Sequence, residues 1–357
     1  MARKALILFS AAVLGCFAFG VFLGVAHARR QARERDEVHF WVRSMGWWNL
    51  VFTEKQQSDF ILTNLRKHQA TSLRVLTGDL AVRSSLSRWR GKIPVLNRYF
   101  PTGVDEDDRE ITRTSAAFYL GDFGHDAQPA IPELLRVLSD DVDQVRMAAA
   151  LALGQIGDSS PLVLAALGHA ATNISPNLAL SSELSLWLLT HADEHRQRAE
   201  TLVGSAPNWA AICLSKLGQT GRPFAGALES IRDTLPFCDS KMAVVRALWE
   251  TTRDKAPVLR AFEELAHELD HPRSTNRLGW TSGETGLANA ASTLDDEPEF
   301  RAALRPLLSK ALQSRNPNVV RVAQIHLEKH AKLDQARLQT PGVRPGGLLE
   351  PPPVAGP

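Results

Sequence analysis

The chain has 357 residues, 44% of them hydrophobic and 22% charged, which is an ordinary composition for a folded protein. Its 41 basic and 39 acidic residues leave a net charge of +2, so no excess of positive charge points to a nucleic-acid partner. Three cysteines are too few for a disulfide scaffold. Of these, Cys213 and Cys238 could pair, but two buried free thiols are the favoured interpretation.

The N-terminal part of the chain contains an apolar run. After a short segment at 1–4, residues 5–26 carry no charge, and 22 residues can cross a bilayer of ~30 Å as one helix. We therefore expect a single-pass membrane anchor, with an extracytoplasmic soluble region favoured over a cytoplasmic one. The alternatives are a signal peptide cleaved after Ala28, a lipoprotein signal ending at Cys16, and a buried soluble helix.

The next two segments lead into the folded region. Residues 29–37 form a charged juxtamembrane segment, and residues 38–108 are predicted to be helices that cap the N-terminal end of a repeat array. Four of the eight tryptophans lie there, namely Trp41, Trp47, Trp48 and Trp89. Adjacent tryptophans suit a membrane interface, but packing within the capping helices is the favoured interpretation.

An internal repeat organises the rest of the chain. Residues 113–124 (RTSAAFYLGDFG) return 33 positions later as residues 146–157 (RMAAALALGQIG). A period in the thirties with a helical pattern indicates stacked helical hairpins. The small residues allow close approach of a neighbouring helix, and the glycines are expected to end each helix.

Residues 145–157, preceded by Asp140 and Asp141, resemble the second helix of a HEAT repeat, and more closely the HEAT-like repeats of the phycobilisome-lyase type. The resemblance is clear over residues 109–172 and degenerate from there to about residue 333. It implies an all-α, armadillo-type fold over 109–333, namely a right-handed α-solenoid of stacked helical hairpins. The apolar run at 5–26 is expected to precede this solenoid as one transmembrane helix. It does not imply bilin attachment, because repeats alone do not carry that activity.

Further helices and one loop are predicted downstream. The helices are expected at 161–171, 178–192, 206–218, 223–235, 241–253, 257–269, 286–294, 298–313 and 317–332. A loop containing Trp280 is expected between His271 and Gly286. Four arginines recur near the repeat spacing, each shortly after an acidic or Asx residue: Arg113, Arg146, Arg246 and Arg321. We interpret them as a structural ladder between hairpins.

The resemblance implies a function in protein–protein interaction, since such solenoids present an extended concave surface. The expected partner is therefore a protein bound along that face, with the chain acting as a membrane-tethered scaffold. Candidate contact residues on the second helices are Ser115, Phe118, Met147, Trp187 and Trp249. For any single one of them, packing in the core is the favoured interpretation.

One motif favours chemistry instead. Residues 267–271 read HELDH, in which His267 and His271 could hold a zinc ion and Glu268 could act as general base. However, the repeat pattern already explains the segment, and no third ligand is identifiable, whereas catalytic zinc usually has three. We expect no cofactor, no metal and no catalytic activity, with a zinc-dependent hydrolase as the alternative. His326 and His330 also stand four apart, and they are expected on the exposed face of the last helix.

The C-terminal segment has a different composition. Residues 341–357 contain six prolines and four glycines, which cannot bury a core. A disordered tail is therefore predicted over 334–357.

Overall fold

The structure is a computed structural model that describes residues 30, 32–34, 37–38, 54–81, 106–235, 239–272, 274–275, 279–295 and 297–339. The predicted anchor at 5–26, the four N-terminal tryptophans, Cys16, Cys238 and most of the predicted tail lie outside these residues. Within the described ranges, no helix is both long enough and apolar enough to span a bilayer.

The regular elements in the described part of the chain are helices, with one isolated bridge between Thr275 and Thr281. In chain order they are α2 (Glu54–Lys67), α3 (Gln69–Ala81), α6 (Glu106–Phe123), the 3-10 helix η2 (Gly124–Ala130), α7 (Ile131–Val137), α8 (Asp143–Ile156), α9 (Pro161–Ala171), α10 (Pro176–Thr190), α11 (Asp193–Val203), α12 (Pro207–Leu217), the 3-10 helix η3 (Gly218–Phe224), α13 (Ala225–Thr234), α14 (Asp239–Thr252), α15 (Ala256–Asp270), α16 (Ser282–Thr293), α17 (Pro298–Ala311) and α18 (Pro317–Gln339).

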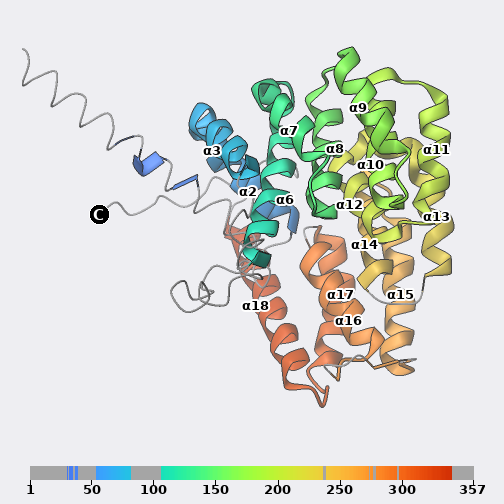
Figure 1. Ribbon diagram of the computed structural model, residues 1–357. Coiled ribbons are helices and arrows are strands. Elements are labelled where there is room, and N and C mark those ends of the chain that lie inside the picture. The colour runs from blue at the N-terminus through green and yellow to red at the C-terminus, as the bar shows by residue number, and fades with distance from the viewer. Residues whose placement is uncertain are drawn as a thin grey trace, which may run out of the picture.

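The helices stack in two layers (Figure 1). The first layer runs through the even-numbered helices from α6 to α18, and the second contains the odd-numbered helices from α7 to α17. Each helix of the second layer packs on a neighbour in the first, and α3 packs on α6 at the N-terminal end. This arrangement confirms the prediction of an all-α solenoid.

Helix α8 shows how the repeat sequence produces the stack. Gly157 follows the helix with a φ of +83°, a left-handed conformation that glycine adopts without steric cost, so it ends α8 as expected. Gly154 was also expected to end the helix, but it lies inside α8. A Cβ placed on Gly154 would stand 2.7 Å from the Cα of Ser185, so only glycine lets α10 pack this closely on α8. The Ser185 hydroxyl then donates to the Ala150 carbonyl at 2.8 Å.

Helix boundaries follow from prolines and caps. Proline occupies the first turn of helices such as α9, α12 and α17, where its missing N–H is not needed. Helix α16 begins four residues before the predicted start, because Thr281 and Glu284 form a capping box. Helix α18 continues to Gln339, beyond the predicted end at residue 332.

Buried apolar side chains form two cores that meet at α14. The first core extends from the N-terminal helices to α14, where it includes Leu248, and the second extends from α14 to α18 and includes Trp249. Helix α14 therefore contributes side chains to both cores. The stack also curves far enough for α2 to lie beside α16.

Polar groups inside the first core are paired with one another. The Trp209 indole N–H donates to the Ser181 hydroxyl at 2.6 Å, and the Cys213 sulfur lies 3.9 Å from the same oxygen. Burial raises the pKa of the Cys213 thiol to about 12, so the thiol is protonated at neutral pH. Cys213 is thus a buried free thiol and not an activated nucleophile.

Candidate functional site

The H-E-x-x-H motif does not assemble a zinc site. His267 and His271 are exposed at the end of α15, with ring centroids 5.1 Å apart. Glu268 is not part of a solvated helix end, as the sequence suggested, but is buried against α16, where it accepts a hydrogen bond from the Ser282 hydroxyl. The proposed base therefore points away from the histidine pair, and this geometry does not support the hydrolase alternative.

The predicted partner residues lie within the packed layers. Ser115, Met147 and Trp249 are buried, and Phe118 and Trp187 are half-buried. Each aromatic member has an aromatic neighbour: Phe118 lies 5.9 Å from Trp209, Trp187 lies 5.1 Å from Phe224, and Trp249 lies 5.1 Å from Phe300. These side chains contribute to the core, which was the favoured interpretation for each of them.

Part of the burial of Phe118 comes from a helix that lies far away in the sequence. Helix α12 comes back to α6, three helices earlier in the same layer, and Lys216 forms an ion pair with Asp122 at 2.5 Å. The Lys216 ammonium also lies 5.3 Å from the ring centroid of Phe118, within cation–π distance. Curvature of the stack therefore covers part of the surface that a straight solenoid would leave open.

Two of the predicted ladder arginines meet at one buried aspartate. Arg113 of α6 lies 2.6 Å from a carboxylate oxygen of Asp140, and both side chains are buried. The other carboxylate oxygen of Asp140 accepts from the Val142 backbone N–H at 3.0 Å, and its carbonyl accepts from Arg146 at 2.5 Å. Asp140 therefore joins α6 to the turn that begins α8, which is the structural role expected of the ladder.

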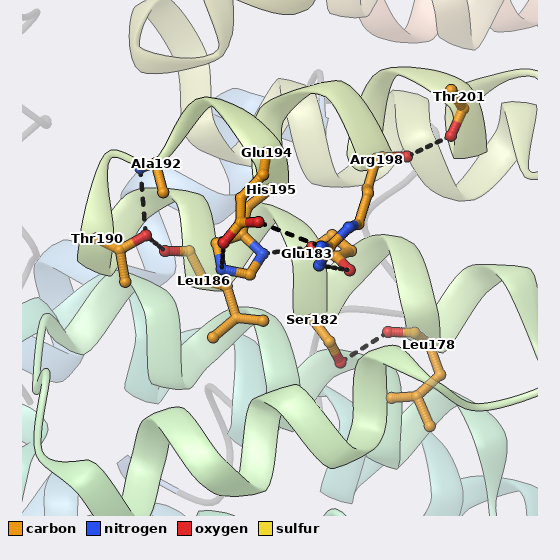
Figure 2. Close-up of polar contacts among 10 residues, drawn as sticks. All are labelled: Leu178, Ser182, Glu183, Leu186, Thr190, Ala192, Glu194, His195, Arg198 and Thr201. Atoms are coloured by element: carbon orange, nitrogen blue, oxygen red, sulfur yellow. Dashed lines mark hydrogen bonds and ion pairs between the residues drawn. The ribbon is translucent and has the colours of Figure 1, made fainter.

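A second buried carboxylate joins α10 to α11 (Figure 2). Glu183 lies 2.7 Å from the Nδ1 atom of His195 and 3.6 Å from Arg198, which both come from α11. In the same view, the Thr190 hydroxyl donates to the Leu186 carbonyl and accepts from the Ala192 N–H. These contacts compensate the buried charge and fix the turn between the two helices, so we assign the cluster a structural role.

An open groove lies on the N-terminal part of the stack. Its volume is about 410 Å³, and it lies between α7 and α9, above the ends of α8 and α10. The lining residues are Leu135, Leu138, Ser139, Asp140, Arg146, Ala166, His169, Ala170, Asn173 and Leu178. Two apolar side chains near it face solvent, Leu162 with 68% and Ile174 with 100% of their surface exposed.

The groove combines apolar side chains with the charged pair Asp140 and Arg146 and a polar edge, and protein interfaces also combine apolar and polar groups. The groove has no signature in the sequence, because it arises from the spacing between α7 and α9. Exposed apolar residues are common on protein surfaces, so Leu162 and Ile174 alone would not have revealed it.

The prediction that His326 and His330 are exposed is wrong. His326 and His330 are buried and face Asp295, which pairs with Lys329. Burial alone would raise the pKa of Asp295, but the two imidazoles and the Lys329 ammonium outweigh it and hold that pKa below its ordinary value. A sequence signal for this burial exists, because Val319, Ala323, His326 and His330 follow one another at helical i, i+3/i+4 spacing.

Comparison with known proteins identifies the repeat. Residues 103–186 match the family model described as HEAT repeats, and this segment contains the whole groove. A search of curated proteins found no significant match to the chain.

Proposed function

We propose that this HEAT-repeat protein is a scaffold that binds another protein, and that the groove between α7 and α9 is its contact site. The observation that carries the proposal is the position of the groove and of two solvent-facing apolar side chains within the matched repeats. HEAT repeats generally mediate protein–protein interaction, and they are typically not catalytic. The type of repeat, phycobilisome-lyase-like or other, and the handedness of the stack remain predictions from the sequence.

The lining of the groove suggests how a partner would bind. The half-buried Leu135 and Leu138 offer apolar surface above the buried Leu178, while His169 and Asn173 stand at the exposed edge. An apolar side chain of the partner would displace water from the leucines, and polar groups around it would bond to the edge. Leu162 and Ile174 would extend the contact beyond the groove.

A paired substitution tests this site. We expect the double variant Leu162→Asp and Ile174→Asp to lose a partner that copurifies with the tagged wild-type chain, because two carboxylates cannot be desolvated without cost. Folding should be unaffected, since both positions are exposed. The measurement is quantitative mass spectrometry of copurified proteins, with thermal denaturation as the folding check.

Ile111→Asp is the matched control, because Ile111 is 54% exposed on α6, a helix that contributes no residue to the groove. By contrast, Leu162 belongs to α9, which lines the groove, and Ile174 follows the lining residue Asn173. This variant should retain the partner. Recovery of the same proteins, in the same amounts, with the Leu162→Asp and Ile174→Asp double variant would place the contact elsewhere on the molecule.

We also propose that residues 5–26 anchor the scaffold in a membrane as a single span, with the repeats on the extracytoplasmic side. The support is the length and apolar character of the run. The full-length chain is expected to stay in the membrane fraction through a carbonate wash, whereas a chain lacking residues 1–28 should be released. A mature protein that begins at Arg29 and is recovered in the soluble fraction would instead establish a cleaved signal peptide.

A further inference from the structure

Three potential metal ligands converge where α18 packs against the turn between α16 and α17. The Nδ1 atom of His326 lies 3.5 Å from Oδ2 of Asp295, and the Nε2 atom of His330 lies 3.4 Å from the same oxygen. All three atoms lie within 4.8 Å of one another. Within the described part of the chain, Asp295, His326 and His330 are the group of three potential metal ligands whose atoms lie this close together.

The three side chains are buried, and the two imidazoles have ring nitrogens without a hydrogen bond. Asp295 and His330 are 0% exposed and His326 is 2% exposed. His326 Nδ1 and both ring nitrogens of His330 lack a hydrogen bond, and the near partner of Asp295 Oδ2 is the Lys329 ammonium at 2.9 Å. Buried polar atoms are almost always satisfied, so two unsatisfied imidazole nitrogens that face one carboxylate oxygen call for a ligand between them.

The distances are compatible with a shared metal ion and are long for direct hydrogen bonds. A good N–H···O hydrogen bond measures about 2.7–3.2 Å between heavy atoms, and both nitrogen–oxygen distances here are longer. Two ligand atoms held at ~2.0–2.1 Å from one tetrahedral zinc ion lie about 3.3–3.4 Å apart. The separations of 3.5 and 3.4 Å are close to that second value.

The surroundings hold the carboxylate in place. The Lys329 ammonium lies 3.0 Å from Oδ1 and 2.9 Å from Oδ2 of Asp295, and Arg301 donates to the Asp295 backbone carbonyl at 2.8 Å. Such outer contacts orient a ligating carboxylate. Lys329 also opposes a cation electrostatically, but its side chain is 13% exposed and has a path to solvent, unlike the three ligands.

We propose that His326, His330 and Asp295 bind one divalent transition-metal ion, with zinc as the ion to be tested. Two histidines four apart on a helix can grip one ion, and imidazole nitrogen with carboxylate oxygen is a ligand set that zinc accepts. The ion ties α18 to the α16–α17 turn. Its three protein ligands leave a fourth position of the kind that water fills in zinc sites.

The test uses the full-length chain, purified in detergent through a tag without histidines. Elemental analysis should give about one zinc per chain after zinc loading and removal of excess metal, and titration against a chromophoric chelator gives the affinity. His326→Ala and Asp295→Asn should each weaken zinc binding by at least about tenfold, the lower end of the range for outer-shell changes. Lys329→Met should strengthen binding, because it removes a positive charge beside the ion.

The exposed pair on α15 is the matched control, since His267 and His271 have the same spacing but no third ligand. The variant His267→Ala with His271→Ala should retain zinc. A folded wild-type chain without stoichiometric zinc would overturn the proposal, as would zinc that is lost from the α15 variant and retained by His326→Ala. If His326→Ala does not fold, the wild-type stoichiometry and the Lys329→Met affinity still decide the matter.

Discussion

Arg113→Met is expected to lower the free energy of unfolding by about 3–5 kcal/mol, the range for removing one partner of a buried ion pair. The reason is the position of Asp140. Its carboxylate is fully buried, and Arg113 is the cation at 2.6 Å that compensates its charge. Without Arg113, either a charged carboxylate stays unpaired in the interior or the protein must protonate it. Chemical denaturation with a fluorescence readout gives the change directly.

Two further variants separate this explanation from a general loss of packing. Arg113→Met combined with Asp140→Asn should recover much of the lost stability, because the buried charge is gone and asparagine can still accept from the Val142 N–H. Arg196→Met is the matched surface control, since Arg196 pairs with the more exposed Asp193 and Glu200 on one helix and should change stability by less than about 1 kcal/mol. Equal losses for Arg113→Met and Arg196→Met would contradict the assigned role of Asp140.

Leu153→Ala is expected to lower the free energy of unfolding by about 2–5 kcal/mol, the range for a buried leucine whose site cannot collapse. Leu153 is 0% exposed and sits next to Gly154, where α8 and α10 are in backbone contact. Helices already this close cannot move inward to fill the space that the leucine leaves. The loss should therefore lie in the upper part of the range, as measured by the denaturation midpoint at constant m-value.

Leu162→Ala provides the comparison for this prediction. Leu162 belongs to the next helix, α9, but is 68% exposed, so its truncation should change stability by no more than about 0.5 kcal/mol. An unchanged midpoint for Leu153→Ala would mean that the repeat register derived from residues 113–124 and 146–157 is incorrect.

Local sequence signals were sufficient where one helix and its nearest neighbour determine the outcome. The small residues of α8 predicted close packing, and the repeat register predicted burial of Leu153, because both properties depend on contacts between adjacent helices. The same holds for helix starts at proline, such as Pro161 and Pro298. The prediction that Gly154 ends a helix was wrong. It lies inside α8, because the left-handed residue that ends this helix is Gly157.

Contacts between distant segments were not predictable in this way. The concave face as a whole was expected to bind a partner, but at Phe118 this face is covered by α12, which returns to α6 through Lys216 and Trp209. No periodicity in either helix encodes that approach, because it depends on the curvature accumulated over several hairpins. Glu268 and the C-terminal histidines illustrate a related failure, in which polar character was taken as a sign of exposure although their positions on the helix face the neighbouring layer.

Because α14 contributes side chains to both cores, it affects how the molecule unfolds. In a linear array whose units contact only their neighbours, melting begins at an end and proceeds unit by unit. Here α14 forms a wall of both cores, with Leu248 on one side and Trp249 on the other. Unfolding of the C-terminal half would expose one face of α14 and weaken the packing on its other face. The contact between α2 and α16 also joins an early helix of the array to a late one. We therefore expect unfolding to couple the two halves through α14 and not to proceed one hairpin at a time.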